Sequence, residues 1–474
     1  MSLHLIGLLA AEPDPGIAAA QTSANTAWIM ASAALVLLMT PGLAFFYGGM
    51  TRAKSTLNMI MMSFSSMGIV SILWVLYGYS VAFAPDKKAG LYGNLTLRFL
   101  HNESQASITG NLYDYAFIAF QLMFAIITLA LISGAVADRM KFSAWVVFST
   151  IWITVVYFPV AHWVFAFGVP ISDPATQAGG AGAAAGYVKG TGGWIVSNLG
   201  ALDFAGGTAV HINAGAAGLA LCLVLGVRKG FGKEAMRPHN LPLVMIGTGM
   251  LWFGWFGFNA GSALLANGLA GIAFVNTQVA TAAALIGWLI VEKLRDGHFT
   301  TLGAASGAVA GLVAITPACG SVSPSGAIAL GGVAGMVCAM AIGIKNKLGF
   351  DDALDVVGVH LVGGLFGTLA IGFLATKTTN GFVDGLFYGG SADQLGKQAV
   401  AAFAVMGYSF FATLIIALAL KYTMGIRVSE EAEITGIDQS EHAETAYEWG
   451  GISTGSSHGT PALAGMTASQ RVVT

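Results

Sequence analysis

Charged residues are scarce in this chain of 474 residues. Lys, Arg, Asp and Glu together make up 9% of it, whereas about 25% is usual for a soluble protein. A folded soluble protein of this length needs charge to keep its surface in water. The scarcity therefore excludes a soluble enzyme. A net charge of −2 without a basic region also excludes a nucleic-acid binder.

Cysteine is scarce as well, and its three positions fall within apolar stretches: Cys222, Cys319 and Cys338. This odd and widely spaced set provides neither a disulfide framework nor a zinc-binding spacing, so we interpret the three as small hydrophobic residues. The sequence also lacks a nucleophile–base set, a metal-ligand cluster and a phosphate-binding loop. We therefore expect neither an enzyme nor a bound cofactor or metal.

Hydrophobic residues, in contrast, make up 55% of the chain. About 20 consecutive apolar residues suffice for a helix to cross the ~30 Å hydrocarbon layer. Eleven such stretches are present, at 28–50, 56–84, 114–136, 142–166, 204–227, 240–264, 272–292, 299–319, 325–344, 354–376 and 398–422. The alternation typical of an outer-membrane barrel strand is absent. The pattern predicts an all-α polytopic membrane protein with eleven transmembrane helices.

The distribution of Lys and Arg predicts the orientation. Six of the 21 fall on one side of the predicted membrane, namely Lys87, Lys88, Arg98, Lys189, Lys377 and Lys397. The others lie in the short loops and the tail on the opposite side. Positive residues concentrate on the inner side of membrane proteins, so we expect the N-terminus outside and the C-terminus inside, in a cytoplasmic membrane.

Four segments follow from this reading. Residues 1–27 form an external N-terminal segment, and an apolar run at 3–11 leaves a signal peptide as an alternative interpretation of it. Residues 28–422 form the transmembrane domain. Residues 423–450 are an acidic cytoplasmic tail, and residues 451–474, rich in Gly, Ser, Thr and Ala, are expected to be disordered.

The pattern Val-His-x-x-x-Gly-x-x-Gly occurs twice, with its histidine at His211 and at His360. The first copy lies in the fifth predicted span and the second in the tenth. Each is preceded by an aspartate, Asp203 and Asp355, at unequal distances. Two halves of five helices start on opposite sides of a membrane, so we predict an inverted repeat plus one extra helix, with the pathway between the halves.

Ionisable residues inside membrane spans are costly and are candidates for function. Equivalent positions in an inverted repeat would bring His211 and His360 together near its axis. A neutral imidazole both donates and accepts a hydrogen bond, which suits a pathway for a small polar solute. The alternative is a packing role, which we favour for His162 because it has no repeat partner. Asp203 begins a span, where a helix cap is favoured over direct cation binding.

Aromatic residues are a second candidate feature. They occur with polar neighbours in the third and sixth spans, as Phe120, Gln121, Phe124, Trp255, Phe256, Phe258, Asn259 and Ser262. Aromatic faces attract a cation, and a serine hydroxyl accepts a hydrogen bond from it. Such stripes also occur as ordinary helix packing.

Several stretches in order along the chain resemble the ammonium transporter family (the Amt, methylammonium permease and Rhesus group), and its bacterial Amt branch in particular. They are 40–49 (TPGLAFFYGG), 203–207 (DFAGG), 211–215 (HINAG), 233–240 (KEAMRPHN), 254–262 (GWFGFNAGS), 316–320 (TPACG) and 355–360 (DVVGVH). The resemblance implies a homotrimer with one pore in each eleven-helix protomer.

The resemblance also implies roles for single residues. His211 and His360 would be the paired pore histidines, and Phe124 and Phe258 the stacked gate. The external ammonium site would contain Ser262, Phe120 and Trp255, with Asp203 and Asp355 as structural residues near the pathway. The family often has a tryptophan after the Ala-His motif of the fourth span. That position falls on Phe165 here, and Trp163 and Trp194 are the alternatives.

The implied function is uptake of ammonium, ammonia and methylammonium across the cytoplasmic membrane. External ammonium would bind, lose a proton and pass through an apolar pore lined by the two histidines. The resemblance further implies a PII-type regulatory protein as cytoplasmic partner of the tail. Two alternatives stay open: a neutral gas channel of Rhesus type, for ammonia or carbon dioxide, and an ammonium sensor that signals through the tail.

Overall fold

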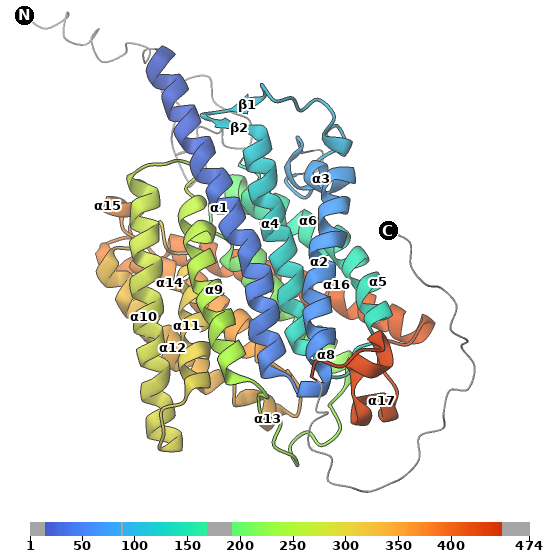
Figure 1. Cartoon of the computed structure of the whole chain (residues 1–474). Helices are drawn as coiled ribbons and strands as arrows, with labels where there is room; N and C mark the ends of the chain where they lie inside the picture. The colour runs from blue at the N-terminus through green and yellow to red at the C-terminus, as the bar shows by residue number, and fades with distance from the viewer. Residues whose placement is uncertain (1–14, 87–88, 168–191, 448–474) are drawn as a thin grey trace, which may run out of the picture.

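The protein was analysed as a computed structural model that describes residues 15–86, 89–167 and 192–447. Its helices run roughly alongside one another, with a small hairpin at one end and the short helices α13 and α17 at the other (Figure 1). Within the described ranges, 10 helices are long and apolar enough to cross a membrane. The prediction of an all-α polytopic membrane protein is confirmed.

The elements of the first half begin with the longest helix. They are α1 (Pro15–Met50), η1 (Ala53–Ser55), α2 (Thr56–Leu73), η2 (Trp74–Gly78), α3 (Tyr79–Phe83), η3 (Arg98–Leu100), β1 (Ile108–Thr109), β2 (Leu112–Tyr113), α4 (Asp114–Ile132), η4 (Ser133–Val136), α5 (Phe142–Trp152), η5 (Ile153–Tyr157), α6 (Phe158–Phe165), η7 (Trp194–Leu199), η8 (Gly207–Ile212) and α8 (Asn213–Leu225). The strands β1 and β2 pair antiparallel.

The second half and the tail continue with helices alone. They are α9 (Leu241–Gly261), α10 (Gly268–Asp296), α11 (Thr301–Ile315), α12 (Pro324–Ala341), α13 (Ile344–Leu348), η9 (Val357–Leu361), α14 (Val362–Leu374), α15 (Lys377–Asn380), η10 (Leu386–Tyr388), α16 (Asp393–Thr423), α17 (Glu430–Thr435) and η11 (Asp438–His442).

Two elements differ in length from the predicted spans. Helix α1 begins at Pro15 rather than at residue 28, so part of the predicted N-terminal segment is helical. Helix α11, which matches the predicted span 299–319, is shorter than the 10 long helices. The total of eleven spans and the orientation remain predictions. Residues 1–14 and the predicted disordered segment 451–474 lie outside the described residues.

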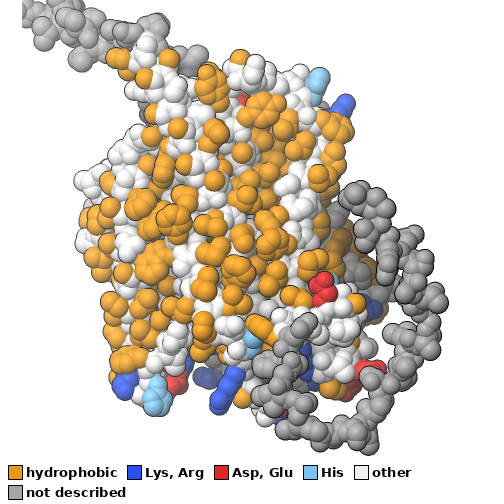
Figure 2. Space-filling view, viewed as in Figure 1, with side chains coloured by type: hydrophobic (Ala, Val, Ile, Leu, Met, Phe, Trp, Pro, Cys, Tyr) orange, Lys and Arg blue, Asp and Glu red, His pale blue; other side chains and the backbone are white. Residues whose placement is uncertain are grey.

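The outer flank of the bundle is apolar. Figure 2 shows hydrophobic side chains over most of the face in view, with charged side chains mainly toward one end. Exposed large apolar residues occur on long helices, for example Leu37 on α1, Phe253 on α9 and Ile286 on α10. Such a surface is stable in lipid, where apolar side chains need no cover. Inside, α1 packs along α9, and α16 packs across both α8 and α14.

Candidate functional site

The two repeated histidines meet in the centre of the protein. His211 lies on η8 and His360 on η9, and their Nδ1 atoms are 3.3 Å apart. Their ring centroids are 5.3 Å apart with planes 20° from parallel. His211 is 1% exposed and His360 is 3% exposed. The structure therefore brings together the two residues that the sequence motif singled out.

The glycines of the same motif explain why the two segments approach so closely. A Cβ atom on Gly215 would lie 2.5 Å from the backbone nitrogen of Leu361, the residue after His360. A Cβ atom on Gly364 would lie 3.1 Å from Cβ of His211. Each glycine stands four residues after its own histidine and packs against the other repeat. The motif thus encodes a crossing point between the halves.

Both histidines lie in π-helical turns, which are wider than an α-helix and are frequent at functional sites. Each turn follows an aspartate that caps it. Asp203 Oδ1 accepts hydrogen bonds from the amides of Gly206 (2.8 Å) and Gly207 (2.7 Å). Its Oδ2 accepts from the amide of Thr208 (2.7 Å) and from the Thr208 hydroxyl. These bonds are those of a helix cap, and they occupy both carboxylate oxygens.

The equivalent residue in the second repeat is Asp352 rather than Asp355. The Asp352 carboxylate accepts hydrogen bonds from the amides of Val356 (3.0 Å) and Val357 (2.7 Å), at the start of η9. Asp355 instead pairs with Lys345, with 2.6 Å between Oδ1 and Nζ. Asp352 stands eight residues before His360, as Asp203 stands eight before His211. That equal spacing was the signal that sequence reasoning missed.

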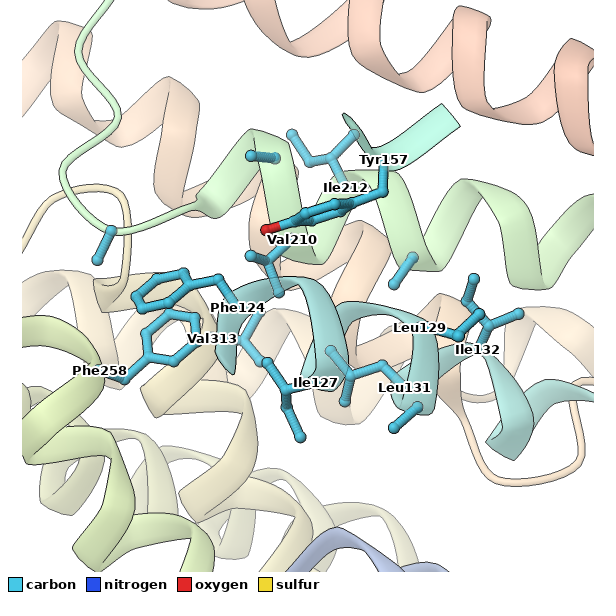
Figure 3. Close-up of a cluster of buried hydrophobic side chains, with 14 of the residues drawn as sticks. Phe124, Ile127, Leu129, Leu131, Ile132, Tyr157, Val210, Ile212, Phe258 and Val313 are labelled. Atoms are coloured by element: carbon cyan, nitrogen blue, oxygen red, sulfur yellow. The ribbon is translucent and has the colours of Figure 1, made fainter. Parts of the chain in front are cut away.

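A row of aromatic rings in contact, here called the file, leads to His211. Its members are Phe120, Phe124, Phe258 and Trp255. Phe124 and Phe258 stack with centroids 4.1 Å apart and planes 23° from parallel, and Figure 3 shows the two rings facing each other. Phe120 contacts Phe124 at 4.9 Å. Trp255 lies 5.4 Å from His211 with nearly parallel planes, and its Nε1 donates to the Thr316 hydroxyl at 2.8 Å. These aromatic rings are fully buried.

Ser262 lies beside Phe258 and has a hydroxyl with a free acceptor side. Ser262 is partly buried and donates its proton to the carbonyl of Phe258 at 2.8 Å. The hydroxyl oxygen therefore keeps lone pairs for an external donor. Gln121 on α4 is also buried, and its Oε1 has no hydrogen-bond partner among the described residues. A cation with N–H groups would satisfy acceptors of this kind.

Phe165 is the aromatic residue of the fourth span that reaches the file. Its ring meets Phe124 edge-on, with centroids 6.0 Å apart. Trp163 instead donates Nε1 to the carbonyl of Leu91 (2.8 Å) and packs against Trp194 and Tyr408. The geometry therefore leaves Trp163 bound to the loop and to α16, with Phe165 as the neighbour of the stacked pair.

His162 lies apart from the two central histidines. Its Nδ1 is 2.9 Å from the carbonyl oxygen of Ala82, and its Nε2 is 3.8 Å from the carboxylate of Asp86. These contacts join α6 to the end of α3. They agree with the packing role that the absence of a repeat partner favoured.

A cluster of buried charged residues surrounds Asp351, the residue before the capping Asp352. The guanidinium of Arg228 bonds both carboxylate oxygens of Asp351 at 2.8 Å and reaches Asp138 at 3.1 Å. Arg139 donates to the backbone carbonyl of Asp351. Burial works against the Asp351 carboxylate, but the hydrogen bonds and charge of Arg228 outweigh it and lower the pKa of Asp351. Burial raises the pKa of the neighbouring Asp352 to about 6.

A sequence model described as Ammonium Transporter Family matches residues 27–447. The chain belongs to this family. An ammonium transporter of Mycobacterium tuberculosis (strain ATCC 25618 / H37Rv) is 56% identical over 447 residues, with 90% of each chain covered. One from Bacillus subtilis (strain 168) is 45% identical over 433 residues, covering 90% of this chain and 98% of the relative.

Solved structures of family members have the same fold. Candida albicans Mep2 matches with a TM-score of 0.77 at 34% identity, covering 86% of this chain and 87% of that chain. A structure described as a sensor Amt protein matches with a TM-score of 0.78 at 29% identity, covering 89% and 99%. Ammonium transport and a multi-pass membrane location are therefore the family-level function and location, and the family is one of transporters rather than enzymes.

The tail of this ammonium transporter family member contacts the ends of two spans. The carboxylate of Asp438 accepts hydrogen bonds from the amides of Leu57 (3.0 Å) and Asn58 (2.8 Å), at the start of α2. Glu441 Oε2 accepts one from the amide of Phe142 (2.8 Å), at the start of α5. A negatively charged side chain is stabilising at a helix N-terminus. Through these two acids the described part of the tail is packed against the transmembrane domain.

Proposed function

We propose that the protein takes up ammonium and methylammonium through a pore between its two halves, with His211 and His360 as the pore histidines. One observation carries this proposal: two buried imidazoles lie 3.3 Å apart at the end of a file of apolar rings. Nε2 of His211 is buried and has no hydrogen-bond partner among the described residues. A buried polar atom of this kind calls for a partner, and a passing ammonia molecule can supply it.

The outer site recruits the cation before it is dehydrated. Phe120, Trp255 and Phe165 offer ring faces and edges, and Ser262 offers an acceptor oxygen. A cation–π contact contributes about 0.5 to 2 kcal/mol, more where water is excluded. The site therefore favours a small cation that can also donate hydrogen bonds.

Beyond this site the substrate crosses as ammonia. Transfer of a bare cation into apolar surroundings costs many kcal/mol, whereas a neutral amine that keeps hydrogen bonds costs far less. Ammonium therefore gives up a proton to water at the outer site before ammonia passes the rings of Phe124 and Phe258, which stack at 4.1 Å and must move apart. The released proton crosses separately and rejoins ammonia on the inner side, so that each uptake event carries one positive charge. The imidazoles then supply a donor and an acceptor along the dry path.

The remaining features of the proposal concern the assembly. The N-terminus is external and the C-terminus cytoplasmic, because Lys and Arg concentrate in the loops on one side. The protein forms a homotrimer, in which exposed apolar faces such as that of α9 pack between protomers. The tail that caps α2 and α5 offers a cytoplasmic PII-type protein a route to the pore.

Growth on limiting ammonium tests the proposed function. A host without its own ammonium transporters should grow when it carries the wild-type gene. The double variant His211→Ala/His360→Ala should fail to restore this growth, because the dry path loses its polar contacts. Equal membrane amounts of the two proteins serve as the control. Normal growth with the double variant would refute the assignment of the two histidines.

A further inference from the structure

Gln398 on α16 is a buried amide whose hydrogen-bonding capacity is fully used. Its Oε1 accepts from the amide of Leu202 (2.7 Å) and from Nε2 of Gln394 (2.9 Å). Its Nε2 donates to the carbonyl of Leu202 (2.7 Å) and to the carbonyl of Thr368 (3.1 Å). The side chain is 0% exposed. One amide thus grips both backbone groups of a single residue in the first repeat and one carbonyl in the second.

Leu202 immediately precedes Asp203, the residue that caps η8. The amide of the next residue, Phe204, donates to the carbonyl of Pro317 at 3.0 Å. The backbone on both sides of Asp203 is therefore fixed, on one side by Gln398 and on the other by Pro317. Because the Asp203 carboxylate binds the first amides of η8, its position sets where the turn that carries His211 begins.

In the other repeat, too, the residue before the capping aspartate is held by a side chain from a distant segment, but that side chain is charged. Asp351 precedes the capping residue Asp352. The Arg228 guanidinium donates to both carboxylate oxygens of Asp351 at 2.8 Å, and Arg139 donates to its backbone carbonyl. In both repeats, therefore, a side chain from a distant segment holds the residue just before the capping aspartate. At one end of the pathway that side chain is a charged guanidinium, and at the other it is the neutral amide of Gln398.

We infer that Gln398 is a positioning residue for the Asp203 end of the pathway. By holding Leu202, it keeps Asp203 aligned with the amides of Gly206, Gly207 and Thr208, and through them it keeps His211 in register with His360. Its bond to the carbonyl of Thr368 ties the same point to α14, which follows His360. The helix outside the repeat thereby locks the two halves together beside the site. The expected effect of Gln398 on transport rests on the proposed function, whereas its expected effect on the backbone around Asp203 does not.

Hydrogen exchange in the purified full-length protein tests the backbone part. Gln398→Met preserves the size of the side chain and removes its four hydrogen bonds. Thr413→Val is the matched control, because Thr413 is also a buried polar residue of α16, and its hydroxyl accepts a hydrogen bond from Nε1 of Trp152 rather than bonding Leu202 or Gln398. We expect Gln398→Met to speed exchange at the amides of 206–208 about tenfold, the effect of losing about one buried hydrogen bond. Exchange at 356–357, under the Asp352 cap, should stay at the wild-type rate, and Thr413→Val should change neither segment.

Transport of methylammonium by the same preparations in liposomes tests the functional part. Gln398→Met should raise the half-saturating concentration about fivefold, while Gln398→Asn, which keeps the amide, should give a smaller increase. Unchanged exchange at 206–208, or an equal rise at 206–208 and 356–357, would overturn the inference. Loss of folded protein in both Gln398 variants would overturn it too, because it would assign the residue to folding. If the wild type carries no methylammonium, the proposed function fails while the exchange result still decides the positioning role.

Discussion

Two imidazoles that face each other through Nδ1 atoms cannot both carry a proton there while they share a hydrogen bond. If His211 donates from Nδ1 across the 3.3 Å contact, His360 accepts and carries its own proton on Nε2. The neutral pair then presents one acceptor and one donor to a solute in the pathway. Ammonia needs both, since it donates through its hydrogens and accepts through its lone pair.

Phe165 gives the most specific test of how the proposed cation site binds its substrate. Its ring centroid lies 6.0 Å from that of Phe124, one ring of the stacked pair. Phe165→Leu removes an aromatic edge of the proposed cation site, and we expect the half-saturating concentration of methylammonium to rise about fivefold. Uptake measured over a concentration series gives this value.

Phe256→Leu provides the control for this measurement. The Phe256 ring stacks on Phe274 at 4.0 Å, away from the file, so its loss should leave the half-saturating concentration unchanged. Equal values for Phe165→Leu and the wild type would show that Phe165 takes no part in recruitment.

The raised pKa of Asp352 predicts that the free energy of unfolding depends on pH. Its pKa is raised to about 6 by burial, so between about pH 4 and 6 the folded state binds a proton that the unfolded state has lost. The contribution of Asp352 to stability therefore falls as pH rises through this range and is constant above it. Asp352→Asn keeps an acceptor oxygen for one of the two capping amides and removes the titrating group, so it should flatten that part of the profile.

Thermal unfolding of the detergent-purified protein at pH 4.5, 6 and 7.5, values that bracket the raised pKa, checks this prediction. The difference between wild type and Asp352→Asn should change mainly between the first two pH values and little between the last two. A constant difference across all three would contradict it.

At the scale of the element, the close crossing of the two repeats depends on glycine. Gly215→Ala places a Cβ atom 2.5 Å from the Leu361 nitrogen, so the backbones must separate. We expect a loss of about 1 to 3 kcal/mol in stability, seen as a lower unfolding temperature, together with reduced transport. Gly407→Ala on α16, where a Cβ meets nothing within 4 Å, should be neutral or slightly stabilising. Equal unfolding temperatures for the two variants would argue against the crossing.

Most helices could be predicted from the sequence because a lipid-facing helix must be apolar along its whole length. The early start of α1 could not, because residues 15–27 are mixed in polarity and their order depends on distant contacts. Asn25 on this extension donates to the carbonyl of Asn111 and accepts from the amide of Ala266, both at 2.9 Å. No local pattern contains that information.

The site was predictable where the repeat was visible. The two histidines stand in matching motifs, whereas Asp352 was overlooked in favour of Asp355 although its spacing is the repeated one. Gln398 has no counterpart in either repeat, because it lies on the helix outside them. Its role depends on a contact with Leu202 that lies far away in sequence.

At the scale of the whole molecule, charge is kept away from the proposed path. The histidines are surrounded by rings and aliphatic side chains, while the buried ion pairs of Arg228, Asp351 and Asp138 hold the backbone at one end. A path of this kind opposes ions and admits small neutral molecules. The same scarcity of charge that is typical of a membrane protein therefore also suits the passage of ammonia that we propose.

The central claim is that ammonium is recruited as a cation and carried selectively past His211 and His360. Electrical recording on a solid-supported membrane with the purified protein in liposomes tests it most directly. The account predicts transient currents after pulses of ammonium and methylammonium but not after potassium, and loss of this selective response in His211→Ala/His360→Ala. Absence of current in the wild type would favour a neutral gas channel. Currents of equal size and selectivity in the double variant would contradict the central claim.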